Sequence, residues 1–226
     1  MKLAWWKILS IACLIYAVVG GMLLPVPARP IVNESIRNLY YHVPMWFGMM
    51  VLMTVSVIYA MLYLRHSRLE YDIQSRWFGG TGMLMGLLGI ITGAIWANYT
   101  WGAPWSNDIK QILAATALLI YAAYFVLRSS IDDIDKKARI SAVYNIFAFA
   151  AMIPLIFIIP RMTDSMHPGN GGNPGFNMYD LDSRMRPIFY AANIGWIAIG
   201  AWIATMRIRT KKIEETIYNL EDEKLI

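Results

Sequence analysis

Two histidines and a tryptophan-rich segment are the residues of this chain best suited to chemistry. His42 and His167 each lie close to a proline between apolar runs, and Trp101 and Trp105 lie in the polar interruption of residues 98–108. A neutral imidazole is a common ligand of haem iron, and two imidazoles from different segments can approach one iron from opposite faces. One interpretation of these residues is therefore a haem site with His42 and His167 as the metal ligands.

Neighbouring side chains fit a haem site, but their presence also has a simpler explanation in a membrane protein. Tyr99, Trp101 and Trp105 offer flat apolar surface for a porphyrin. Basic residues predicted on the same face could pair with haem propionates, namely Arg37, Lys110 and Arg184. Aromatic residues also gather at the interfaces of any membrane protein, and exposed arginine and lysine bind lipid headgroups. Membrane lipid is thus an expected partner in either case.

Other site chemistries have less support. Zinc takes three or four His, Cys or carboxylate ligands, and only Asp108, Asp164, Asp180 and Asp182 could complete such a set with the two histidines. Cys13 is the only cysteine and lies in an apolar run, so a disulfide framework is excluded. No nucleophile with an adjacent base is visible, and we expect the protein not to be an enzyme.

The elements that must position these residues are membrane-spanning helices. Hydrophobic residues make up 58% of the 226 residues, and they form six runs near the ~20 residues that cross a bilayer as a helix. We predict an all-α, polytopic membrane protein in which residues 1–206 form one haem-handling domain. The predicted spans are residues 8–24, 45–64, 80–97, 109–127, 140–159 and 188–206. Residues 207–226 form a charged tail that could fold as a short surface helix.

The basic residues predict the orientation. Most of the 20 lysines and arginines fall in segments on one side of the predicted spans, which the positive-inside rule makes cytoplasmic. Both termini are then cytoplasmic, His66 lies inside, and His42, the tryptophan segment and His167 face outward. We interpret residues 8–24 as an uncleaved helix, with a cleaved signal peptide as the alternative. No basic stripe suggests nucleic acid.

Several local signals predict how the helices begin and pack. Pro44 suits the first turn of the second span, which would leave His42 just outside that helix. Asp108 or either residue before it could cap the fourth span. The loop before the last span is rich in glycine across residues 169–175, and we expect it to be mobile unless a ligand orders it. Four glycines in the third span predict close approach of another helix: Gly82, Gly86, Gly89 and Gly93.

At this point the sequence resembles a known family. Residues Trp101 to Lys110 resemble the tryptophan-rich WWD signature of haem-handling proteins in cytochrome c maturation. The segments around His42 and His167 are similar to the two external histidine motifs of the haem exporter protein C (CcmC) family. Trp101, Gly102, Trp105 and Asp108 match the signature, whereas Pro104 and Asn107 replace its usual tryptophans and Lys110 replaces an arginine.

The resemblance implies a function in cytochrome c-type biogenesis in a bacterial cytoplasmic membrane. Such a protein would bind haem b as cargo at the outer surface, with His42 and His167 as axial ligands and the tryptophan segment as the platform. It would present the haem to a membrane-anchored, CcmE-like haem chaperone, alongside ABC-transporter subunits and a small membrane subunit. The main alternative is a structural or assembly subunit without its own haem site. A solute transporter is disfavoured because the predicted spans contain no ionisable His, Asp, Glu, Lys or Arg apart from Lys110 at the very start of the fourth.

Overall fold

The computed structural model describes residues 4–28, 32–167 and 181–224, and within these ranges the chain is helical without strands. Six helical segments are long and apolar enough to cross a membrane, as predicted. The Gly-rich segment 169–175 lies outside the described residues. The elements are α1 (Trp5–Leu23), η1 (Asn33–Asn38), α2 (Leu39–His66), α3 (Leu69–Trp101), α4 (Ile109–Ser129), α5 (Ile134–Ile153), η2 (Pro154–Ile158), α6 (Ile159–Met162) and α7 (Arg186–Lys224).

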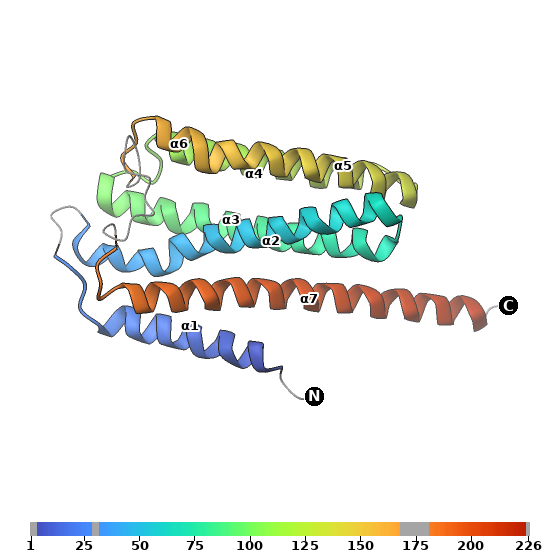
Figure 1. The fold of residues 1–226 in the computed structure, drawn as a ribbon, viewed down its shortest axis with the longest axis horizontal. Coiled ribbons are helices and arrows are strands. Elements are labelled where there is room, and N and C mark those ends of the chain that lie inside the picture. The colour runs from blue at the N-terminus through green and yellow to red at the C-terminus, as the bar shows by residue number, and fades with distance from the viewer. Residues whose placement is uncertain (1–3, 29–31, 168–180, 225–226) are drawn as a thin grey trace.

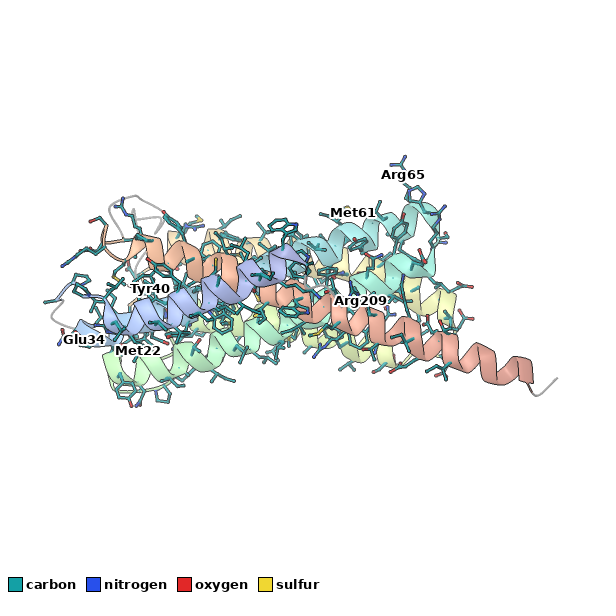
Figure 2. The ribbon with its side chains drawn as sticks, turned by 90° about the horizontal axis from the view of Figure 1, so that it is seen from below. Met22, Glu34, Tyr40, Met61, Arg65 and Arg209 are labelled. Atoms are coloured by element: carbon teal, nitrogen blue, oxygen red, sulfur yellow. The ribbon has the colours of Figure 1, made fainter. Side chains whose placement is uncertain are left out.

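The helices form a bundle around the α2–α3 pair (Figure 1). Helices α4, α5 and α6 lie on one side of this pair, and α7 lies on the other with α1 beyond it. Figure 2 shows Glu34 and Tyr40 toward one end, with Arg65 and Arg209 in the other half. The C-terminal end of α1, the α3–α4 loop and the C-terminal end of α6 share the first end, which we call the loop end (Figure 1).

The predicted glycine face of α3 packs directly against α2. A Cβ atom at Gly82 would meet Met53 at 3.1 Å, and one at Gly89 would meet Trp46 at 2.8 Å. Both distances are shorter than an ordinary van der Waals contact of a Cβ atom. The α2 side chains therefore occupy space on α3 that only glycine leaves open, and the two helices approach closely. Successive turns of the two antiparallel helices therefore pair in order: Met53 with Gly82, Met49 with Gly86, Trp46 with Gly89 and His42 with Gly93.

The prediction that His42 lies outside the second helix is wrong. Helix α2 begins at Leu39, so His42 lies in its first turn and Pro44 lies inside the helix. The 3₁₀ helix η1 runs directly into α2, and tertiary contacts hold this turn before the proline. Asn38 donates to the Thr92 carbonyl of α3 at 2.9 Å. These contacts override the preference of proline for a helix start.

Two other boundaries differ from the apolar runs. Tyr99 and Trp101 belong to the last turns of α3, because this helix continues to Gly102, whose φ of 80° forms a left-handed C-cap. The loop between α3 and α4 is thus shorter than predicted. The charged tail continues α7 to Lys224 and is not a separate surface helix. Helix α7 extends past its apolar run because charged residues with good helix propensity continue it into water.

A buried ion pair joins α3 to α4 in the half of the bundle away from the loop end. Arg128 donates two hydrogen bonds to the Asp72 carboxylate, at 2.6 and 2.5 Å, and the exposed fractions of the two residues are 9% and 7%. The predicted span 109–127 ends one residue before Arg128, and sequence reasoning gave neither Arg128 nor Asp72 a role in the bundle. Such a pair contributes little net energy, but removing one partner leaves a buried charge unpaired.

We therefore expect Asp72→Asn to lower the free energy of unfolding in detergent by about 3 kcal/mol, because Arg128 would stay buried without its carboxylate. Denaturant titration followed by circular dichroism measures this. Glu70→Gln is the control, since the Glu70 contact with Lys212 is longer, at 3.9 Å, and both side chains are exposed. Equal losses in the two variants would contradict a special role for the buried pair.

Candidate functional site

A cavity of about 180 Å³ lies at the loop end, and both histidines line it. Its walls come from α2, α3, α4, the η2–α6 segment and the α3–α4 loop, so elements far apart in sequence meet there. The lining is mostly apolar, with Lys110 as the one cation among the lining residues of the described chain. The remaining residues lining it are Trp46, Gly89, Ile90, Gly93, Ala94, Pro104, Trp105, Gln111, Ala114, Leu155, Ile156 and Pro160.

The His42 ring is fixed against α3. Its Nδ1 lies 3.0 Å from the Gly89 carbonyl oxygen and 3.3 Å from the Thr92 hydroxyl. Because a carbonyl only accepts hydrogen bonds, Nδ1 must donate, and Nε2 then carries the lone pair. A Cβ at Gly93 would lie 2.6 Å from His42 Cε1, so the ring occupies space that any other residue at position 93 would fill.

Aromatic side chains complete the surroundings of His42. The rings of Trp46 and Trp96 pack edge to face with the imidazole, with centroids 6.2 and 5.9 Å away. The Trp96 indole in turn donates to the Ser35 hydroxyl at 3.2 Å, which joins α3 to η1. The imidazole therefore has little freedom to rotate, and its remaining nitrogen is held in a defined direction.

His167 is held by a carboxylate. Its Nδ1 lies 2.8 Å from Asp108 Oδ1, and Asp108 is the N-cap of α4, as one of the predicted candidates. Burial raises the pKa of Asp108, but hydrogen bonds from Met166 N, Ser165 and Lys110 N outweigh it and hold the pKa below its usual value. The carboxylate is therefore ionised and accepts from Nδ1, which leaves the lone pair of His167 on Nε2.

Burial in the cavity keeps His167 neutral. Burial lowers the pKa of the imidazole, and this effect exceeds the opposing influence of the Asp108 charge. At neutral pH the ring is thus in the form that can bind a metal. The Trp101 ring packs edge to face with it at a centroid distance of 4.6 Å, so the last turn of α3 also supports His167.

Polar contacts shape the α3–α4 loop around the cavity. The Trp105 indole donates to Asn107 Oδ1 at 2.8 Å, and Asn107 has a φ of 56°, a left-handed conformation that asparagine tolerates well. Gln111 accepts hydrogen bonds from the backbone N and hydroxyl of Ser106 at 2.9 and 3.1 Å. Asn107, which departs from the family signature, therefore orients one of the tryptophans that match it.

The predicted site residues separate into two groups. His42, His167, Trp105 and Lys110 line the cavity, while Trp101 and Asp108 contact His167 and Gly102 ends α3 beside the loop. The structure does not bring the other three to the cavity: Tyr99, Arg37 and Arg184. Tyr99 is 77% exposed, Arg37 donates to the Gly21 and Leu24 carbonyls at the end of α1, and Arg184 pairs with Asp182.

Sequence reasoning predicted the glycine face of α3 but missed that Gly93 makes room for the His42 ring, and it missed one wall of the cavity. The fifth span changes from α-helix to π-helix at Pro154, and Leu155 and Ile156 of this π-helical turn face the cavity. Such turns occur often at functional sites, and Pro154 and Pro160 were the available signal. Among the described residues no group of three or more His, Cys, Asp or Glu is arranged to hold a metal ion, and Asp180, one of the acids named for a zinc set, lies outside those residues.

Comparison with known proteins gives a family match over nearly the whole chain. The family described as "Heme exporter protein C" matches residues 1–222. The chain is also similar to proteins named "Cytochrome c biogenesis protein CcsA". The protein from Thermosynechococcus vestitus is 46% identical over 63 residues, which are 28% of this chain and 20% of that protein.

Two further relatives have the same name, and each also matches this chain over a limited segment. The protein from Synechococcus sp. strain CC9902 is 41% identical over 69 residues, or 30% of this chain and 23% of its own length. The Pelargonium hortorum protein is 33% identical over 93 residues, or 41% of this chain and 29% of its own length. The chain thus matches less than a third of the length of these curated relatives.

The Asp108 cluster leads to a prediction about local order. We expect Asp108→Ala to raise amide hydrogen exchange about fivefold in the first turn of α4 and in residues 163–167, because the carboxylate loses the N-cap bond from Lys110 N and its bonds from Ser165, Met166 N and His167. Hydrogen exchange with mass spectrometry measures this. Asp164→Ala, at a neighbouring exposed position, is the control. Unchanged exchange in Asp108→Ala would show that other contacts hold the His167 segment.

Proposed function

Because the chain belongs to the haem exporter protein C family, we propose that it handles haem during cytochrome c maturation. It binds haem b in the cavity between His42 and His167 and passes it to another protein. Haem is cargo in this proposal, so the protein is a carrier and not an enzyme.

The observation that carries the proposal is the pair of histidines on one cavity. Both rings have Nδ1 directed at an oxygen acceptor, the Gly89 carbonyl for His42 and the Asp108 carboxylate for His167. An acceptor behind Nδ1 fixes the tautomer and orientation of a metal-binding imidazole and raises its basicity. Each histidine is therefore prepared to coordinate iron through Nε2, from α2 on one side and from the segment after α6 on the other.

The size of the cavity supports a carrier. Pockets that enclose a small-molecule ligand usually have about 300–1,000 Å³, and this cavity has about 180 Å³. It can hold the iron region of the porphyrin between the imidazoles, while the rest of the ring extends beyond the cavity. A partly enclosed haem remains accessible to an acceptor protein, which suits transfer better than permanent retention.

The other residues that line the cavity have roles in this proposal. The apolar walls and the Trp105 ring, which is 42% exposed at the rim, provide surface for the porphyrin. Lys110, at the start of α4, is the cation that we assign to a propionate. Arg37 and Arg184 are already engaged with α1 and with Asp182, and the proposal gives them no haem contact.

The proposal places the loop end at the outer face of the bacterial cytoplasmic membrane, with both termini inside. Its support is the excess of lysine and arginine on segments at the opposite end of the spans. In keeping with the family, the acceptor is a membrane-anchored, CcmE-like chaperone, and the complex includes ABC-transporter subunits and a small membrane subunit. The alternative remains an assembly subunit without a haem site. In that case the charged C-terminal end of α7 would bind the partner subunits.

Haem ligation is tested with purified protein in mild detergent. We expect His42→Ala and His167→Ala each to weaken haem binding at least about tenfold, since even removing a residue behind a metal ligand costs roughly 10- to 100-fold. The measurement is the Soret absorbance during haem titration. Free imidazole should restore the band in each variant by entering the space of the deleted ring.

The matched control for this test is His66→Ala, because His66 is exposed at the opposite end of α2. It should titrate like the unmodified protein. If neither cavity variant changed the Soret band, or if the unmodified protein bound no added haem, the assembly-subunit alternative would replace the haem-site proposal.

Delivery needs its own test. We expect the haem-loaded protein to lose its Soret band to a tagged, haem-free CcmE-like chaperone, with the band recovered in the chaperone fraction after separation. The physical reason is the partial enclosure of the porphyrin. Retention of haem by the carrier, with intact ligation by both histidines, would reject delivery to this partner while leaving haem binding established.

A further inference from the structure

Two arginines converge on one tryptophan in the half of the bundle away from the haem cavity. The Arg76 Cζ lies 4.7 Å from the centre of the Trp77 ring, and the Arg207 Cζ of α7 lies 5.7 Å from it. Arg207 Nη1 is also 3.9 Å from the position that a Cβ at Gly80 would take. The guanidinium of α7 therefore reaches across to the face of α3 around Gly80, which lies one helical turn from both Trp77, three residues before it, and Arg76, four residues before it.

Neither arginine has a carboxylate at ion-pair distance among the described side chains. The nearby acids of α3 are already engaged, because Asp72 pairs with Arg128 and Glu70 contacts Lys212. Two cations held close to the same ring repel each other unless an anion lies between or beside them. The ring faces attract each cation, but this does not cancel their mutual repulsion. The cluster of Arg76, Trp77 and Arg207 therefore carries an excess positive charge without an anion from the described protein.

The depth of the cluster indicates which anion is available. Trp77 stands three residues before the predicted apolar run 80–97 of α3, and Arg207 directly follows the run 188–206 of α7. Both helices thus leave the hydrocarbon at this level, where tryptophan side chains and lipid headgroups are found. Basic side chains between membrane helices at this level commonly bind the phosphates of acidic lipids.

We propose that Arg76, Trp77 and Arg207 form a binding site for the phosphodiester group of an acidic phospholipid. The two guanidinium groups hold the phosphate oxygens by charge-assisted hydrogen bonds, and the acyl chains lie along the apolar surfaces of α3 and α7. The site joins these two helices through the lipid, in addition to their direct packing. It is independent of haem binding, which takes place at the other end of the bundle.

Native mass spectrometry of the whole protein tests the site, with phosphatidylglycerol and phosphatidylcholine of identical acyl chains as probes. We expect preferential retention of phosphatidylglycerol. Its affinity should fall about fivefold in Arg76→Gln or Arg207→Gln and about thirtyfold in the double variant, which corresponds to about 1 kcal/mol for each charge. The single variants carry the test if the double variant does not elute as a monodisperse species.

The matched control is Arg209→Gln, because Arg209 is exposed on the same helix two residues further on (Figure 2). We expect less than a twofold change in phosphatidylglycerol affinity. An equal loss in this control, or equal retention of the two lipids, would overturn the site in favour of general surface attraction. Displacement of the lipid by millimolar inorganic phosphate would overturn the lipid assignment and identify a site for free anions.

Discussion

The close approach of α2 and α3 is the constraint on which the rest of the structure depends. Four glycines of α3 receive, turn by turn, Met53, Met49, Trp46 and His42 of α2. The first two contacts lie in the core of the bundle, and the last two lie on the wall of the cavity. The packing that holds the membrane helices together and the packing that positions one proposed haem ligand are therefore the same interaction, because one helix pair continues from the core to the site.

The two histidines are positioned by different means. His42 lies on a membrane helix and directs Nδ1 at a helix carbonyl, so the whole bundle holds it. His167 lies beyond α6 and depends on one carboxylate, Asp108, which also caps α4 and accepts from Met166 N and Ser165. One proposed ligand thus belongs to the stable core, and the other belongs to a segment that local contacts retain. Segments with few buried apolar contacts open at lower free energy than a packed core, so the His167 side is the part of the site suited to releasing cargo.

Sequence reasoning predicted the parts of this arrangement that depend on composition and helix period. The six spans, the packing face around Gly86 and the capping of α4 follow from apolar run length, glycine spacing and local side-chain chemistry. The start of α2 did not follow, because Asn38 bonds to α3 and overrides the local signal of Pro44. The pairing of Asp72 with Arg128 likewise depends on which helices are neighbours. Arg37 and Lys110 were equivalent candidates for a propionate contact in the sequence. The structure distinguishes them, because Arg37 donates to a carbonyl of α1 whereas Lys110 lines the cavity.

The space at Gly93 has a consequence for how this chain can change. The His42 ring occupies the place of a side chain at position 93, so the two positions together hold one side chain. A descendant that loses the histidine is free to acquire alanine or a larger residue there. After that step, restoring the histidine alone no longer restores the site, since the ring has lost its place against α3. Loss of this proposed ligand is therefore difficult to reverse once position 93 carries a side chain.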